Sequence, residues 1–435
     1  MDVIFLLIFL FFLLKGKYTW VLFGIILLTT NYLGAGTNLS NFPVQHNVSD
    51  SGLLLYLALS LRILFRTNGK LSSGPFDKYL LFFYLFLLLS IFVDIFINKI
   101  DLLSIIKTSR HWLFLTCFWI FYYIPKEEIK KLLIYLLTAT LFINLISITE
   151  YTFGIEILGL RKSEERLLTG MTFSRGAIPS TFSIFFMFLV FLDYFELKLK
   201  WKIIIIGILA AGILISMIRS LIIAVIISLA LIILIKRRKT FKESLLTMSI
   251  IVTFIWIVFA SPFIKERFNE AYMDLKELDT SKRNVSGNLS FRALHIAERF
   301  KYVSHRIQYS IFGIGNITEE SFPRIFKTGL RNDQGQFVQL DTSDNAWSLL
   351  FIRLGIVGTI IYVLLYFKFL FLDINMYSRS IMALVMFVFL IINLIVLSFA
   401  SSTIANGSFW ILPTLLYFTI IQELDSENAI KQQNA

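Results

Sequence analysis

Long uninterrupted apolar runs constrain this chain more than any other feature of its sequence. Four of them are roughly twenty residues long, which is enough for an α-helix to cross a bilayer; they are residues 79–98, 245–264, 347–371 and 381–399. The chain of 435 residues is 57% hydrophobic, and its mean hydropathy is +0.76. A soluble protein of this composition would expose large apolar patches. The sequence therefore predicts a membrane protein.

Hydropathy predicts about twelve or thirteen membrane-spanning helices, of which the first is the weakest. The fold class that we predict is an all-α polytopic membrane protein with one large extracytoplasmic loop containing amphipathic helices. Residues 1–262 would form the N-terminal membrane helices, residues 263–345 the loop, and residues 346–435 the C-terminal helices with a short tail. The predicted spans are residues 3–14, 18–34, 51–65, 79–98, 111–124, 132–149, 179–195, 203–217, 220–235, 245–263, 347–371, 381–399 and 409–421.

Basic residues collect in short loops, which the positive-inside rule assigns to the cytoplasm. The densest cluster is Lys236–Lys239, and alternation from it predicts a cytoplasmic tail from Gln422 and an outer large loop. We therefore expect a multi-pass protein of the bacterial inner membrane, with residues 1–14 retained because they carry no cleavage signature. Two predicted outer segments, residues 99–110 and 150–179, break the rule with Lys107, Arg110, Arg161, Lys162, Arg166 and Arg175.

The net charge of +12 and these outer cations favour anionic lipid or lipid-phosphate partners over nucleic acid, for which the sequence has no motif. Cys117 is the single cysteine and falls inside a predicted span. The four histidines lack metal-ligand spacing, and no acidic cluster resembles a divalent-cation site. We therefore expect chemistry without a metal or other cofactor.

The large loop contains a segment with two stripes at helical spacing, residues 291–311. One stripe is apolar, with Ile296, Phe300, Val303 and Ile307, and the other is basic, with Arg292, His295, Arg299 and Arg306. Such a helix can lie at the membrane interface, where its cations would meet lipid phosphates. The alternative is a solvated helix that caps the bundle, and the pattern leaves both interpretations open.

Two charged residues at predicted membrane boundaries are candidates for chemistry. Asp344 precedes the span that begins near Trp347, and its carboxylate could accept a proton from a sugar hydroxyl. Capping of the following helix is the alternative role, and the local pattern alone favours it. Arg219 lies at the outer end of a tight helical hairpin, where either function or snorkelling to the interface explains it.

At the end of the large loop, Asp344 and Asn345 precede Trp347, and the following helix carries Gly355 and Gly358. This arrangement resembles the end-of-loop signature of the O-antigen ligase and polymerase superfamily, in which a His-Asn or Asp-Asn pair precedes a helix with two glycines so spaced. Ligases of the superfamily place histidine at the position of Asp344. The difference favours a polymerase.

Three upstream segments resemble the same superfamily, so the resemblance covers about half of the chain, from Arg166 to Gly358. Ile218 departs from the family pattern, which has serine before the hairpin arginine. The glycines in residues 312–315 predict a tight turn that returns the chain, without the context of a phosphate-binding loop. The three segments are Arg292 with residues 312–315, residues 215–220 around Arg219, and Arg166 with Gly170.

The resemblance implies a metal-independent membrane glycosyltransferase that acts on undecaprenyl-diphosphate-linked oligosaccharides as donor and acceptor, making O-antigen, capsular or exopolysaccharide chains. Membrane lipid and a chain-length regulator protein would be further partners. We hypothesise that the catalytic residues are Asp344, Arg219 and Arg292. The expected substrate-binding residues are Arg166, Arg299, His295, Asn345 and Arg175.

Two alternatives remain open from the sequence. A ligase would transfer finished glycan to a lipid A core or to a protein, and only the residue at position 344 argues against it. A transporter of lipid-linked oligosaccharides would also have about twelve helices. Transporters usually contain internal repeats and lack a single large outer loop, and this sequence shows the opposite pattern.

Overall fold

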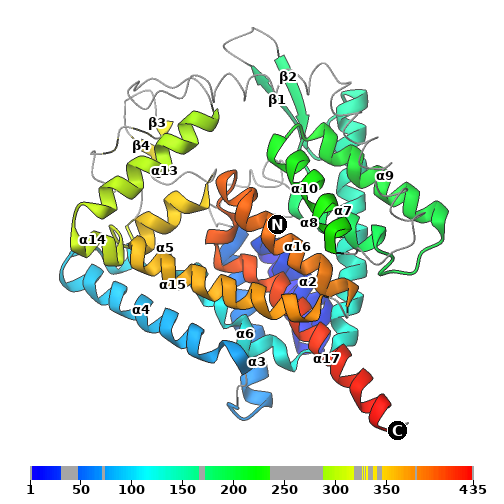
Figure 1. Ribbon diagram of the computed structural model, residues 1–435, viewed down its shortest axis with the longest axis horizontal. Coiled ribbons are helices and arrows are strands. Elements are labelled where there is room, and N and C mark those ends of the chain that lie inside the picture. Colours follow the sequence, from blue (N-terminus) through cyan, green and yellow to red (C-terminus); the bar gives the residue numbers. More distant parts are fainter. Residues whose placement is uncertain are drawn as a thin grey trace.

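The computed structural model describes residues 2–30, 48–70, 74–165, 172–235, 288–317, 326, 328, 330–331, 337–339, 345–377 and 380–433. Helices dominate this part of the chain, and α4 (Asp77–Phe96) packs alongside α15 (Ala346–Met376) (Figure 1). Four helical segments in the described residues are long and apolar enough to cross a membrane: Gly74–Phe96, Lys126–Phe153, Ala346–Leu372 and Ile381–Phe399. The predicted all-α polytopic membrane fold is confirmed.

Most predicted spans of the N-terminal half form helices with similar bounds, and α7 extends beyond the predicted span 132–149 at both ends. Exposed leucine and phenylalanine side chains cover one face of α4, as expected for a surface in contact with lipid (Leu81, Phe82, Leu85, Leu88, Leu89 and Phe92). The helices are α1 (Asp2–Leu14), α2 (Tyr18–Thr29), α3 (Val48–Arg66), η2 (Gly74–Phe76), α4 (Asp77–Phe96), α5 (Leu102–Ser109) and α7 (Lys126–Phe153).

The predicted span over residues 111–124 forms three short helices instead of one. They are η3 (Arg110–Thr116), α6 (Cys117–Ile120) and η4 (Phe121–Tyr123). A close backbone approach accompanies the change, since a Cβ at Gly407 would lie 2.1 Å from the carbonyl oxygen of His111. Residues 110–123 therefore pack against the other helices as a series of short, mainly 3₁₀ helices.

Helices α8 (Ser180–Phe191), α9 (Leu199–Ile215) and α10 (Arg219–Ile235) form a layer with α7. Small residues set its spacing: a Cβ at Gly212 would lie 1.7 Å from Oδ1 of Asn144, whose amide donates to Ser183 Oγ at 3.0 Å. The predicted span over residues 245–263 and the cluster Lys236–Lys239 lie outside the described residues.

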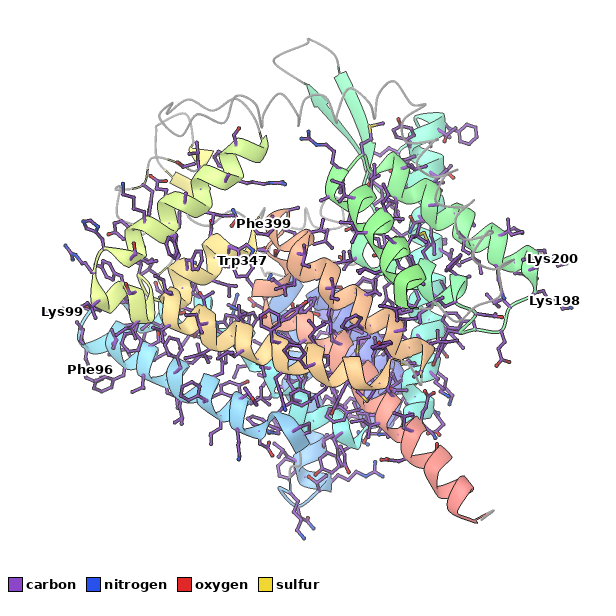
Figure 2. All side chains as sticks on the ribbon, in the orientation of Figure 1. Phe96, Lys99, Lys198, Lys200, Trp347 and Phe399 are labelled. Atoms are coloured by element: carbon purple, nitrogen blue, oxygen red, sulfur yellow. The ribbon has the colours of Figure 1, made fainter. Side chains whose placement is uncertain are left out.

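The C-terminal helices build the aromatic centre of the bundle. The Nε1 of Trp410 donates to the hydroxyl of Tyr362 at 2.9 Å, and Phe369 packs edge-on against Trp410. Figure 2 shows the density of side chains here, with Trp347 and Phe399 near the middle of the molecule. The elements are α15 (Ala346–Met376), α16 (Ile381–Ile395), η6 (Leu397–Phe399), η7 (Thr403–Ala405), η8 (Gly407–Trp410) and α17 (Ile411–Gln433).

The described extramembrane elements are two helices and two small hairpins that the sequence analysis did not predict as strands. Strands β1 (Arg161–Glu165) and β2 (Thr172–Gly176) pair antiparallel, as do β3 (Leu330–Arg331) and β4 (Phe337–Gln339). The large loop contributes α13 (Asn288–Ser304) and α14 (Ile307–Phe312). In Figure 1, α13 and α10 stand on opposite sides of the upper half of the molecule, with β1 and β2 above α10.

Candidate active site

The predicted basic stripe lies on α13 and faces the protein interior. His295 and Arg299 are both 0% exposed, whereas Phe300 from the predicted apolar stripe is 45% exposed. Val303, from the same apolar stripe, is buried. His295 and Arg299 therefore do not lie on a solvated face, and the apolar stripe is only partly exposed.

The predicted helix over residues 291–311 is divided in two. Helix α13 ends at Ser304 and α14 begins at Ile307, with Arg306 in extended backbone between them. Arg306 and Ile307 are exposed, and they lie outside the stripes to which the sequence pattern assigned them. The buried basic face of α13 consequently consists of Arg292, His295 and Arg299, with Arg292 half-buried.

A hydrogen bond fixes the basic face of α13 to the start of α15. The Nδ1 of His295 lies 2.7 Å from the hydroxyl oxygen of Ser348, and both side chains are buried. Ser348 lies in the first turn of α15, next to the loop end that the sequence analysis singled out. The contact joins residues separated by 53 positions, which the sequence pattern alone did not reveal.

Asn345 caps α15. Its Oδ1 accepts a hydrogen bond from the backbone nitrogen of Ser348 at 2.8 Å, the usual contact between an N-cap and the third helical residue. The capping role that the pattern assigned to Asp344 therefore belongs to Asn345. The Nδ2 of Asn345 is buried and has no hydrogen-bond partner in the described part of the chain, so it is available to a substrate or a bound water.

Asp344 and Arg166 lie outside the described residues. Asn345, the next residue in the sequence after Asp344, is tied to the basic face of α13 through Ser348, which bonds to both Asn345 and His295.

Arg299 is held by an ion pair and by an aromatic ring. Its Nη1 pairs with Oε2 of the neighbouring Glu298, and its guanidinium carbon lies 4.2 Å from the ring centroid of Phe326. Glu298 Oε2 also accepts a hydrogen bond from the backbone nitrogen of Thr328 at 3.0 Å. These contacts attach the loop around residues 326–328 to α13 and keep the buried guanidinium in a fixed orientation.

Arg219 is the first residue of α10. The hairpin before it is tight, because Met217 has a φ of +51° and the hydroxyl of Ser216 donates to Ile213 O at 2.7 Å. The guanidinium therefore extends from the positive end of a helix dipole, where an anion is favoured. Helices α10 and α15 both contact η6, and Trp347 Nε1 donates to Ser398 Oγ in η6 at 3.0 Å.

Arg175 lies on β2, opposite Lys162 of β1. The hairpin is anchored by Glu150, a buried residue near the end of α7 that the sequence analysis did not select. Its carboxylate accepts hydrogen bonds from the backbone nitrogens of Ile157, Leu158 and Leu160. Glu150 thus fixes the segment that leads into the basic hairpin.

A second buried polar cluster joins α4 to the end of α14. Asp94 accepts hydrogen bonds from Asn316 and from Asn98, and Arg353 donates to the carbonyl of Ile317. The glycine-rich turn expected over residues 312–315 is confirmed, with φ values of +75° at Gly313 and +102° at Gly315.

This turn docks into a kink in α15. Gly355 has a φ of +68° inside the helix, and the carbonyl of Ile352 accepts a hydrogen bond from Ile314 N at 2.8 Å. A Cβ at Gly313 would lie 2.2 Å from that carbonyl oxygen, and one at Gly355 would lie 2.5 Å from Gly313 N. Gly313 and Gly355, one from each glycine pair singled out in the sequence, therefore allow one close backbone contact.

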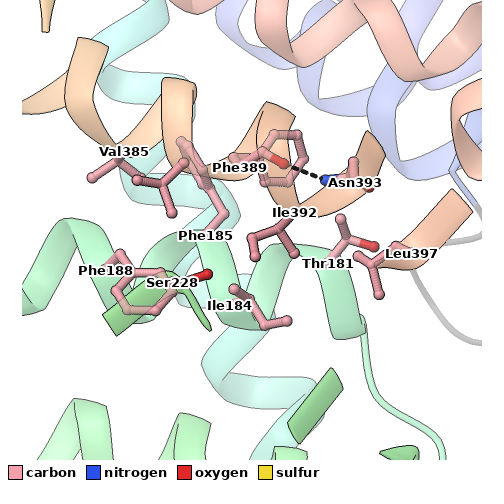
Figure 3. A pocket seen from close by; sticks show the side chains of 11 residues that line it. Thr181, Ile184, Phe185, Phe188, Ser228, Val385, Phe389, Ile392, Asn393 and Leu397 are labelled. Atoms are coloured by element: carbon pink, nitrogen blue, oxygen red, sulfur yellow. Dashed lines mark hydrogen bonds between the residues drawn. The ribbon is translucent and has the colours of Figure 1, made fainter. Parts of the chain in front are cut away.

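Figure 3 shows a pocket between α8, α10 and α16 that is lined mainly by apolar side chains. Its polar lining groups are the hydroxyls of Thr181 and Ser228 and the amide of Asn393, which donates to Phe389 O at 2.8 Å. None of the candidate residues lines it, and it contains no titratable side chain. We assign it no chemistry.

The basic face of α13 and the first turn of α15 offer a substrate fixed cations and hydrogen-bond donors. Among the described residues, no three His, Cys, Asp or Glu side chains are grouped so as to hold a metal ion. Arginine can stabilise phosphate charge without a metal, because its planar guanidinium matches phosphate oxygens.

Residues 204–363 match the family model described as O-antigen ligase. The matched segment runs from α9 to the middle of α15 and includes six candidate residues: Arg219, Arg292, His295, Arg299, Asp344 and Asn345. No curated protein matches the chain. The family match confirms the resemblance to the O-antigen ligase and polymerase superfamily. This family implies a membrane setting and lipid-linked sugar substrates.

Proposed function

We propose that the chain is an inner-membrane glycosyltransferase that polymerises undecaprenyl-diphosphate-linked oligosaccharide repeat units at the outer face. The bond between the anomeric carbon of the growing chain and its diphosphate breaks, and a bond forms from that carbon to a hydroxyl oxygen of a fresh repeat unit. Undecaprenyl diphosphate leaves with the bonding electron pair, and the hydroxyl proton passes to a base. A single displacement of this kind inverts the anomeric centre.

One observation carries this proposal: the buried basic face of α13 is bonded to the first turn of α15, directly after the Asp-Asn pair. The pair supplies a carboxylate in the sequence, and the contacts of Ser348 bring buried cations and the amide of Asn345 to the same helix end. A base, cations and a hydrogen-bond donor suit a reaction in which one group loses a proton while another gains negative charge.

The developing charge on the diphosphate would be stabilised by arginines. Arg219 at the start of α10 and Arg292 on α13 are our primary candidates, because each is partly accessible and mounted on a helix. Arg299, His295, Arg166 and Arg175 would bind the substrates. Preorganised cations in a site that excludes water contribute most at the moment when charge appears.

Asp344 would act as the base, and Asn345 would orient the acceptor. The cap leaves Nδ2 of Asn345 as a buried donor, which could hold either the Asp344 carboxylate or the attacking hydroxyl. Aspartate at this position, where ligases of the superfamily have histidine, supports polymerisation over ligation. We place the large loop outside, the C-terminus in the cytoplasm, and a chain-length regulator among the partners.

The test is gel analysis of glycan from cells that lack the protein and are complemented with Asp344→Asn or with the matched Asp341→Asn. A polymerase predicts single repeat units on the terminal acceptor for Asp344→Asn and a full ladder for Asp341→Asn. Full-length chains that accumulate on undecaprenyl diphosphate would instead identify a ligase. Repeat units that never reach the outer face would identify a transporter, and both of these outcomes contradict the proposal.

A further inference from the structure

An open depression lies beside the basic face of α13, on the surface formed with α14. It is lined by three aromatic rings and four charged or titratable side chains, here called the outer depression: Glu298, Lys301, Tyr302, His305, Arg306, Tyr309 and Phe326. None of these residues belongs to the candidate catalytic set. The outer depression adjoins the candidate substrate-binding residues, because the guanidinium carbon of Arg299 lies 4.2 Å from the ring centroid of Phe326.

Two of the three rings, those of Tyr302 and Tyr309, are partly accessible, and Phe326 is buried beside them. Tyr302 and Tyr309 are stacked, with centroids 5.8 Å apart and an interplanar angle of 17°, and Phe326 lies 4.8 Å from Tyr302. Tyrosine offers an apolar ring and a polar hydroxyl at once. Such a surface fits a sugar ring, whose C–H faces are apolar and whose edge carries hydroxyls.

The charge of the outer depression is positive. Lys301, His305 and Arg306 are exposed, and the guanidinium carbon of Arg306 lies 5.4 Å from the centroid of Tyr309. Glu298, the single acidic residue in the lining, is engaged by Arg299 and by the backbone nitrogen of Thr328. An anionic ligand would therefore meet cations at the rim of the aromatic surface.

The outer depression lies on the side of α13 opposite Phe300. Glu298 and Tyr302 lie two residues before and after Phe300, which puts each about 160° from it around a helix that turns about 100° per residue. Phe300 is 45% exposed, and its ring centroid lies 5.3 Å from that of Phe351 in α15. The charged lining of the outer depression is therefore separate from the exposed apolar side chain of this helix.

We propose that the outer depression is a glycan-binding subsite that holds acidic sugar residues of the chain, such as uronates, next to the reaction centre. This inference rests on the proposed polymerase function for its biological role. A sugar would stack on Tyr302 and Tyr309 while Arg306 pairs with its carboxylate. Burial raises the pKa of Tyr302, and the neighbouring Tyr309 raises it further, so the hydroxyl of Tyr302 remains a hydrogen-bond donor at neutral pH.

Binding is measured without turnover, by titrating the full-length protein in phosphatidylcholine nanodiscs with tetragalacturonate or with neutral maltotetraose. We expect tetragalacturonate to bind more tightly, and Arg306→Gln or Tyr309→Leu to weaken its binding roughly tenfold or more. The matched control is Lys200→Gln, since the Lys200 ammonium lies 5.6 Å from the ring of Trp201 at a distant part of the molecule (Figure 2). The control should bind as the unmodified protein does.

Equal binding of the two tetrasaccharides, or the same loss in Lys200→Gln, would overturn the proposal. Displacement of tetragalacturonate by phosphatidylglycerol in the nanodiscs would identify a lipid headgroup site and overturn it too. The outcome is separable from that of the Asp344 test, because loss of polymerisation in Asp344→Asn leaves the outer depression intact. If tetragalacturonate binds as expected but the glycan ladder does not depend on Asp344, the subsite stands and the polymerase assignment fails.

Discussion

The carboxylate of Asp94 accepts two hydrogen bonds from Asn316, one from its backbone nitrogen and one from its side-chain amide, each at 2.9 Å. These residues are 222 positions apart, and the pair fixes the end of the α14 segment to a membrane helix. Gln308 adds a further link from α14, donating to Asn98 at 2.7 Å. The elements that position the basic face of α13 therefore depend on a buried polar contact with α4.

Gly315→Ala should destabilise this contact. A Cβ at this position would lie 2.1 Å from Oδ1 of Asp94, and the residue has a φ of +102°. The strain and the overlap together should lower the free energy of unfolding by roughly 1–3 kcal/mol. Thermal unfolding in detergent measures the change. Gly207→Ala is the control, because no atom lies within 4 Å of a Cβ there and alanine favours a helix; an equal loss in both variants would contradict the argument.

Two substitutions at Asn345 should separate its two roles. Asn345→Asp keeps a side-chain oxygen for Ser348 N and therefore keeps the cap, but it removes the buried Nδ2 donor. Asn345→Ala removes both, and loss of a cap costs about 1 kcal/mol. We expect Asn345→Asp to unfold at nearly the normal temperature yet to make short glycan chains, and Asn345→Ala to be impaired in both measurements. Normal chain length in Asn345→Asp would show that the donor serves no substrate.

The membrane helices could be predicted because their signal is local. A run of about twenty apolar residues can satisfy its backbone only as a helix inside a bilayer, and the bounds of α4 and α15 follow the runs closely. The segment over residues 111–124 was the exception. Its short helices accompany a backbone contact between His111 and Gly407, a partner that hydropathy cannot identify.

The site was less predictable because its contacts are distant in sequence. The pattern identified the two stripes of α13, but burial of the basic one is tied to Ser348, which bonds to His295 across 53 positions. Glu150 and Asp94 both lie near the ends of predicted spans. Only their hydrogen bonds to distant backbone nitrogens show that they are buried residues that hold two segments together. Asn345 caps α15 because the helix begins at Ala346. A cap at Asp344 would require the helix to begin one residue earlier.

Chelators should leave the reaction unchanged. The proposed mechanism assigns the diphosphate charge to arginines. Chain extension by the protein in nanodiscs, supplied with lipid-linked repeat units, should proceed equally in EDTA and in added Mg²⁺. Loss of extension in EDTA with recovery on adding Mg²⁺ would require a metal in the mechanism and would contradict the arginine assignment.

Arg219→Gln and Arg292→Gln should each slow chain extension about 10²- to 10³-fold, as expected when one preorganised charge is removed from a developing anion. Glutamine keeps most of the side-chain volume and a hydrogen-bond donor, so membrane insertion should be normal in both variants. Arg66→Gln is the matched control, since it removes an exposed arginine from the end of α3. Rates of extension and the amount of inserted protein are measured side by side. If Arg66→Gln slows extension as much as Arg219→Gln, the effect reflects overall charge, and the role assigned to the arginines is wrong.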